Sequence, residues 1–139
     1  MSPRKVIFDT NIYIDWLNAG LHEELLLGRG FVRYMSAVVL MELRTGATML
    51  PARRAVDQLA RAYGSGGRLV APPLDVFDRA GRTLQLLREA GREIRRASLV
   101  DDVLIALTAR ALGATVFTAD EDYEAIRAVL DFDLERVTR

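Results

Sequence analysis

The segment 6–11 constrains the fold more than any other part of the chain, because a short apolar run there ends in an acidic residue. Val6, Ile7 and Phe8 are β-branched or aromatic, which favours a buried strand, and Asp9 stands where that strand ends. In open α/β sheets, ligands bind at the carboxyl ends of the strands, where loops and helix N-termini converge. Asp9 is therefore the first candidate functional residue.

The rest of the sequence alternates short strands with helices. Strands are predicted at 31–35, 69–71, 115–118 and 132–137, and helices at 11–18, 21–27, 37–47, 51–63, 75–90, 98–112 and 123–129. We expect Ser36 and Asp75 to cap the helices that follow them. The alternation predicts an α/β fold, with a parallel sheet of four to five strands covered on both faces, in one domain spanning residues 1–139.

The composition excludes several kinds of chemistry. The chain has no cysteine, which excludes disulfides, thiolate metal sites and a cysteine nucleophile. Its single histidine, His22, lies in a helical-looking segment that does not resemble a nucleophile elbow, so a Ser-His-Asp triad is not expected. No apolar run approaches the roughly 20 residues that cross a bilayer, and the start leads directly into a strand. We expect a cytoplasmic protein without a membrane partner.

The charge balance is neutral, with 19 basic and 19 acidic residues, so the net charge gives no general argument for a polyanion partner. Only Lys5 is a lysine, and the other basic residues are arginines. The guanidinium group suits phosphate and stacks on bases, which would fit RNA, but a coding bias explains the arginines equally well.

Four acidic residues follow strands or lie early in helices on the same side of the predicted sheet. Asp9 and Asp120 follow strands, while Glu42 and Asp102 lie in helices, and all four can point into one cleft. Carboxylates at such short distances from one another repel, so either their pKa values rise or a multivalent cation lies among them. Oxygen ligands without histidine or cysteine favour Mg²⁺ or Mn²⁺, which suit phosphodiester hydrolysis.

A purely structural role, as a helix cap, is an alternative to metal binding for each of the aspartates. Asp9, Asp101, Asp102 and Asp120 all precede or open predicted helices, and Asp101 and Asp102 are placed in the first turn of the helix 98–112. An aspartate there commonly caps free backbone N–H groups. Considered one at a time, each of these aspartates can be explained as a helix cap. The hypothesis of a metal site depends on four acids lying at the same edge of the predicted sheet.

Four segments in this order resemble the motifs of PIN-domain proteins, and in detail those of the VapC toxin ribonucleases of toxin-antitoxin pairs. They are 6–11, 36–46, 102–109 and 117–123, and the resemblance extends from Val6 to about Val129. It implies a PIN-like three-layer α/β/α fold and a Mg²⁺- or Mn²⁺-dependent endoribonuclease that hydrolyses RNA.

The resemblance also assigns the site. It implies that Asp9, Glu42, Asp102 and Asp120 are the catalytic quartet, and that Asp9, Asp102 and Asp120 bind the metal. Supporting positions are Asn11 and Thr118, where the family often has small polar residues, together with Asp101, ranked second to Asp102, and Asp122, which competes with Asp120.

The same resemblance implies a homodimer and a cognate antitoxin whose tail occupies the cleft. Such an antitoxin would gain from placing an arginine among the carboxylates, because charge-assisted hydrogen bonds are strong there.

Three alternatives are weighed against this interpretation. A phosphoacceptor receiver domain needs a lysine near the end of a late strand, and Lys5 precedes the first strand. A haloacid-dehalogenase-type phosphatase needs Asp-x-Asp, but the sequence has Asn11 two residues after Asp9. A catalytically inactive PIN-like module that binds RNA or a protein would have lost acidic ligands, and here all four acids are present.

Overall fold

The computed structural model describes residues 2–139 and contains a five-stranded sheet in the order β3-β2-β1-β4-β5, with every neighbouring pair parallel. The strands are β1 (Arg4–Phe8), β2 (Phe31–Ser36), β3 (Leu69–Val70), β4 (Thr115–Thr118) and β5 (Leu134–Arg136). The predicted α/β fold with a central parallel sheet is therefore confirmed.

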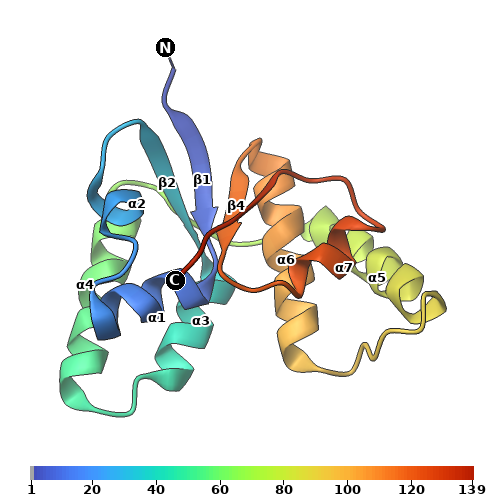
Figure 1. Cartoon of the computed structure of the whole chain (residues 1–139), viewed down its shortest axis with the longest axis horizontal. Coiled ribbons are helices and arrows are strands. Elements are labelled where there is room, and N and C mark those ends of the chain that lie inside the picture. The colour runs from blue at the N-terminus through green and yellow to red at the C-terminus, as the bar shows by residue number, and fades with distance from the viewer. Residues whose placement is uncertain (1) are drawn as a thin grey trace.

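Helices flank this sheet on both sides. They are α1 (Thr10–Ala19), α2 (Glu23–Leu27), α3 (Ala37–Gly46), α4 (Leu50–Ser65), α5 (Leu74–Glu89), α6 (Ala97–Leu112) and α7 (Tyr123–Arg127). Figure 1 shows α1, α2 and α4 on one side of the strands, and α5, α6 and α7 on the other. Within residues 2–139, no helix has the length and apolar character needed to cross a membrane.

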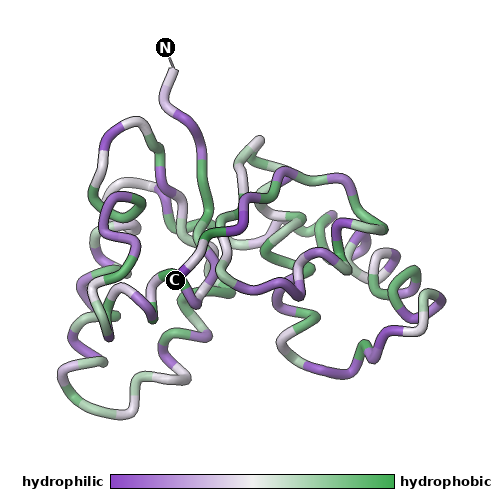
Figure 2. Tube along the Cα trace, viewed as in Figure 1, coloured by the Kyte–Doolittle hydropathy of each residue, from purple (hydrophilic) through white to green (hydrophobic). Residues whose placement is uncertain are grey.

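The two central strands carry the core. Val6, Ile7 and Phe8 of β1 are fully buried, and the ring of Phe8 packs edge-on against Phe117 of β4, with ring centroids 5.7 Å apart. Edge-to-face pairs add to the stabilisation that burial of the rings provides. Figure 2 shows hydrophobic residues along β1 and hydrophilic ones along the connection from α5 to α6.

The strand order reverses between β1 and β4. From β1 the chain continues outward to β2 and β3, and it then returns to place β4 and β5 on the opposite side of β1. The two central strands are joined at their carboxyl ends by a 2.9 Å hydrogen bond from the Asp9 N–H to the Phe117 carbonyl. In open α/β sheets such a switch point leaves a crevice where ligands bind.

The helix starts confirm one predicted cap and correct two other predictions. Ser36 caps α3, since its hydroxyl accepts a 3.1 Å hydrogen bond from the Val38 N–H. Asp75 lies in the first turn of α5 but makes no capping bond. The predicted start of α6 was late by one residue; the helix begins at Ala97, so Asp101 and Asp102 lie in its second turn and not its first.

Two glycine substitutions test the backbone assignments. Gly113 follows α6 with a φ of 68°, whereas Gly81 lies inside α5, and neither has an atom within 4 Å of an added Cβ. Gly113→Ala should lower the free energy of unfolding by about 1 kcal/mol, because alanine disfavours the left-handed region. Gly81→Ala should raise it by about 0.5–1 kcal/mol. Urea unfolding measures both, and equal signs would contradict the two assignments.

Candidate active site

The structure brings the four predicted acids close enough to act on one another near the carboxyl ends of β1 and β4. Asp9 directly follows β1, and Asp120 lies two residues beyond the end of β4. Glu42 comes from α3 and Asp102 from α6, two helices that contact each other. Their charges act on one another: Asp9 and Glu42 both raise the pKa of Asp102, and Asp120 raises the pKa of Asp9.

Asp9 is the most firmly held of these carboxylates. Its side chain is only 5% exposed, and its Oδ1 accepts a 2.8 Å hydrogen bond from the Thr10 N–H, which caps α1. The Oδ2 atom accepts hydrogen bonds from the Thr118 hydroxyl at 2.8 Å and from Asn11 Nδ2 at 3.1 Å. Asp9 is thus both a helix cap and part of the acidic group, so the two interpretations of this residue are compatible.

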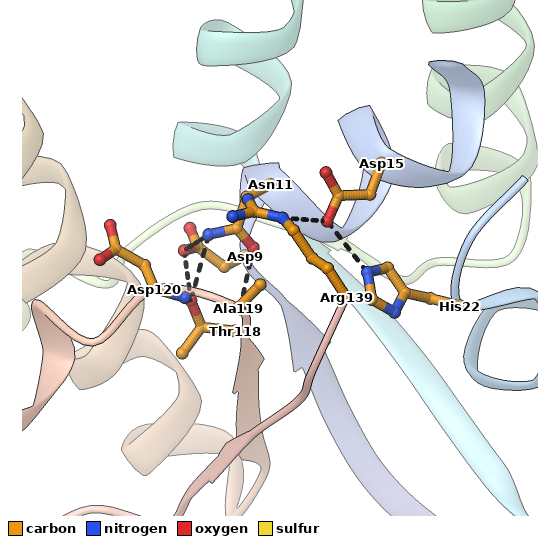
Figure 3. Close-up of polar contacts among 8 residues, drawn as sticks. All are labelled: Asp9, Asn11, Asp15, His22, Thr118, Ala119, Asp120 and Arg139. Atoms are coloured by element: carbon orange, nitrogen blue, oxygen red, sulfur yellow. Dashed lines mark hydrogen bonds and ion pairs between the residues drawn. The ribbon is translucent and has the colours of Figure 1, made fainter. Parts of the chain in front are cut away.

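Asn11 and Thr118 tie the ends of β1 and β4 together (Figure 3). Asn11 Oδ1 accepts a 3.2 Å hydrogen bond from the Ala119 N–H, and its Nδ2 lies 3.3 Å from the Thr118 hydroxyl. That hydroxyl also accepts a 3.0 Å bond from the Asp120 N–H. The network fixes both the Asp9 carboxylate and the turn that carries Asp120.

Glu42 of α3 and Asp101 of α6 influence each other within the acidic group. The Thr10 hydroxyl donates a 2.6 Å hydrogen bond to Glu42 Oε1. Burial raises the pKa of Glu42, the bond from Thr10 lowers it, and the charges of Asp101 and Asp9 raise it further. Burial also raises the pKa of Asp101, which Glu42 partly offsets through a hydrogen-bonding interaction.

The surroundings of Asp102 strongly oppose its ionisation. Its side chain lies on the core-facing side of α6 and the residue is 9% exposed. Burial, followed by the charges of Asp9 and Glu42, raises the pKa of Asp102 to about 8. Burial likewise raises the pKa of Asp9, although hydrogen bonds from Thr118 and Thr10 oppose the shift. In the protein alone, the buried acids cannot all be ionised comfortably at neutral pH.

Asp120 and Asp122 point in different directions. Asp120 Oδ1 accepts a 2.9 Å hydrogen bond from the Asp122 N–H, which shapes the turn before α7. Asp122 is exposed, and its Oδ2 lies 3.9 Å from Nη2 of Arg96 in the connection between α5 and α6. The structure therefore places the side chain of Asp122 beside an arginine at the rim of the site.

Sequence reasoning missed one residue of this site, Tyr123. Its side chain is completely buried, and its hydroxyl interacts with the carboxyl groups of Asp9 and Asp102 closely enough to lower the pKa of each. The hydroxyl nevertheless has no hydrogen bond of regular geometry within residues 2–139. An aromatic residue directly after an acidic turn was the available signal, but Tyr123 was interpreted only as the start of a helix.

His22 belongs to a separate polar group. Its Nε2 lies 3.0 Å from Asp15 Oδ2, and that same oxygen accepts a 2.8 Å hydrogen bond from Arg139 Nε. Figure 3 shows this group beside the Asp9 network, with no interaction drawn between the two. Its contacts tie the end of the described chain to α1.

The oxygen atoms of these acidic side chains are chemically suited to bind a hard divalent cation. The acidic side chains offer carboxylate oxygens, and two of them, Asp9 and Asp102, are buried at a cost that a cation would offset. As the side chains stand, however, no group of three or more histidine or acidic residues in the described chain is close enough to hold an ion. Asp9, Glu42 and Asp120 each accept a hydrogen bond from the protein, and each carboxylate keeps further lone pairs that could bind a cation.

Comparisons with known proteins agree on the fold. The model of the PIN domain matches residues 6–129. A search of curated protein sequences finds no match. Similar solved structures include VapBC2 from Rickettsia felis bound to promoter DNA, with 21% identity over 96% of this chain and 98% of that chain at a TM-score of 0.71.

Two further structures are similar over nearly their whole length. VapBC-1 from Haemophilus influenzae has 21% identity over 95% of this chain and 97% of that chain, with a TM-score of 0.69. VapBC-5 from Mycobacterium tuberculosis has 22% identity over 99% of this chain and 100% of that chain, with a TM-score of 0.64. At these identities the likeness establishes the shared fold.

The raised pKa of Asp102 predicts a pH-dependent stability of the metal-free protein. Above about pH 4 the unfolded chain ionises Asp102, whereas the folded chain resists ionisation up to about pH 8. Stability is therefore lost as the pH rises through this window, by roughly 2–4 kcal/mol between pH 5 and 8. Asp102→Asn should remove most of this loss, as measured by urea unfolding in the presence of a chelator.

The exposed Asp131 provides the control, since Asp131→Asn should keep the wild-type pH dependence. A parallel pH dependence of wild type and Asp102→Asn would contradict the electrostatic account of the site.

Proposed function

Because the chain belongs to the PIN domain family, we propose that it is a metal-dependent endoribonuclease that acts as the toxin of a type II toxin-antitoxin pair. The proposal is carried by the group of acids at the switch point of the parallel sheet, where the charges of Asp9, Glu42 and Asp120 all raise the pKa of Asp102. Buried acids with oxygen donors alone fit Mg²⁺ or Mn²⁺.

In the proposed mechanism, Asp9, Asp102 and Asp120 would hold the cation, and Glu42 would accept a proton from the attacking water. A bound divalent cation would polarise that water and offset the negative charge of the scissile phosphate. Asn11 and Thr118 orient the Asp9 carboxylate through their hydrogen bonds, and Thr10 does the same for Glu42. Asp101, next to Glu42, supports the same side of the cleft.

The connection between α5 and α6 offers a contact surface for the substrate. Arg92 and Arg96 line a hollow of about 300 Å³ with Asp122, and Arg95 is exposed beside them. Arg96 directly precedes α6, and its Nη2 lies 3.9 Å from Oδ2 of Asp122, in the turn that also carries Asp120. We propose that these arginines contact RNA phosphates at the rim of the acidic cleft.

The protein partners are proposed from the structural neighbours. Among these are a member of the VapBC family of toxin-antitoxin systems and a toxin-antitoxin complex from Klebsiella pneumoniae. We propose that this chain forms a homodimer and binds a small cognate antitoxin that covers the acidic cleft. An adjacent upstream reading frame whose product copurifies with the chain would support the antitoxin; its absence would count against the toxin role and leave the nuclease role standing.

A second candidate function is a PIN-like module that binds RNA or a protein without cutting. One observation favours it: the described side chains form no ready-made three-ligand site, and three of the four acids are engaged by hydrogen bonds within the protein. A cleavage assay separates the two functions.

Metal-dependent cleavage is the direct test. Wild-type protein should cleave structured RNAs with Mn²⁺ and should lose this activity on chelation. Asp9→Asn and Asp102→Asn should each lower the rate at least about 100-fold, because each removes a ligand charge. Asp131→Asn, on the exposed surface, should cleave as wild type does. Cleavage by both active-site variants at the wild-type rate would reveal a contaminant and count against the site.

The arginine surface is tested separately from catalysis. In the Asp9→Asn background, RNA binding is measured by fluorescence anisotropy across a salt series. Arg92→Gln with Arg95→Gln should weaken binding and reduce the salt slope by about 1–2, since each phosphate contact contributes about 0.9. The matched control is a double variant with Arg29→Gln and Arg110→Gln. Both arginines are exposed; Arg29 precedes β2 and Arg110 lies near the end of α6. Equal effects of the two double variants would contradict a specific rim contact.

A further inference from the structure

Helix α5 carries a second apolar stripe besides the one that packs into the core. The stripe consists of Leu74, Phe77, Gly81 and Leu84, which are three or four residues apart and so share one face of the helix. Leu74 is 89% exposed and Phe77 is 54% exposed. The core-facing residues of the same helix are Val76, Ala80, Thr83 and Leu87.

The second stripe lies at the periphery of the molecule. Figure 1 shows α5 beyond α6, which separates it from the strands, and α6 is the element that α5 contacts most. Scattered apolar residues on a surface are ordinary, but an ordered run along one helix face marks a surface that another molecule can cover. The question is which molecule fits it.

Gly81, in the middle of the stripe, is not required by the packing of a single chain. Its φ is not positive, and a Cβ added there would meet no atom within 4 Å. Inside a helix, glycine is the least favourable residue apart from proline. Its place suits a close crossing by a second helix, because the absence of a side chain lets two helix axes approach to the short end of the usual range of about 8–10 Å.

The charges along α5 fit an antiparallel copy of the same helix. Arg88 lies in the last turn, and Gly81 lies midway between Leu74 and Arg88. A twofold axis at Gly81 would therefore set Arg88 of one copy beside Leu74 of the other, within reach of the partner's Asp78. Asp78 is exposed and is held by a 3.2 Å ion pair with Arg82, which leaves room for a second cation. Antiparallel helix dipoles favour the same arrangement.

We propose that α5 is the self-association surface of this protein and packs antiparallel against α5 of a second copy, with Gly81 at the crossing. Phe77 of each copy then lies beside the partner's Leu84, and Arg88 pairs with the partner's Asp78. This inference rests on the homodimer of the proposed function and goes beyond it by naming the surface. An unrelated protein partner would not require charges matched about a twofold axis.

Sedimentation equilibrium of the purified chain over a concentration series tests the surface. Wild type should dimerise, and Phe77→Glu should raise the dimer dissociation constant at least about 10-fold, because it places a carboxylate in an apolar contact. The matched control is Leu86→Glu. Leu86 is 45% exposed on another side of α5, in a hollow that Leu107 of α6 also lines, so this variant should dimerise as wild type does. Far-UV circular dichroism shows whether each variant remains folded.

A charge exchange tests the antiparallel arrangement without an apolar change. Arg88→Asp should weaken the dimer at least about 3-fold, because it faces the partner's Asp78 with a like charge. Adding Asp78→Arg to Arg88→Asp should restore dimerisation, since the two charges then match again across the twofold axis. A double variant that dimerises no better than Arg88→Asp would overturn the arrangement.

The outcomes separate this inference from the proposed function. Wild type that sediments as a monomer at every concentration would overturn both this inference and the proposed homodimer, while leaving metal-dependent cleavage standing. A dimer that Phe77→Glu and Leu86→Glu weaken equally, or that neither weakens, would overturn the role of α5 alone, because the two copies would then meet elsewhere. Loss of RNA cleavage in the nuclease assay would overturn the enzyme and leave the dimer surface standing.

Discussion

Electrostatic repulsion among buried carboxylates is the constraint around which this molecule is arranged. Every residue from Val6 to Phe8 of β1 and from Thr115 to Thr118 of β4 is buried, so the chain leaves the core at a place with little water to screen charge. Asp9 and Asp102 lie there with raised pKa values, and Glu42 adds to the repulsion. A fold that gathers acids in this way is stabilised by protons or by a divalent cation.

Hydrogen bonds from uncharged groups hold the acids in place despite this repulsion. Thr118 and Asn11 bind Asp9, and Thr10 binds Glu42, so the donors come from the ends of β1 and β4 and from the start of α1. Because these donors are neutral, they orient the carboxylates without cancelling their charge. The arrangement keeps the negative potential of the cleft available to a cation, whereas an arginine in the same position would neutralise it.

The corrections to the sequence-based interpretation concern local position. Because α6 begins at Ala97, Asp101 and Asp102 are its fifth and sixth residues and lie in the second turn, where a carboxylate no longer faces the free N–H groups. The capping interpretation of these two residues therefore fails, while Asp9 does cap α1. Tyr123 was missed because an aromatic residue after an acidic turn also fits the start of a helix, and only the tertiary structure brings its hydroxyl under the influence of Asp9 and Asp102.

The sequence by itself determined the strands and helices, the parallel sheet and the acids at its edge, because those features follow from local patterns of apolar and polar residues. Only the tertiary structure decided that β4 lies beside β1, which brings Thr118 within 2.8 Å of Asp9 across 109 positions of the chain. Strand order, burial and pKa shifts depend on contacts between distant segments. A single sequence does not encode those contacts in any short pattern, since they arise only when the core packs.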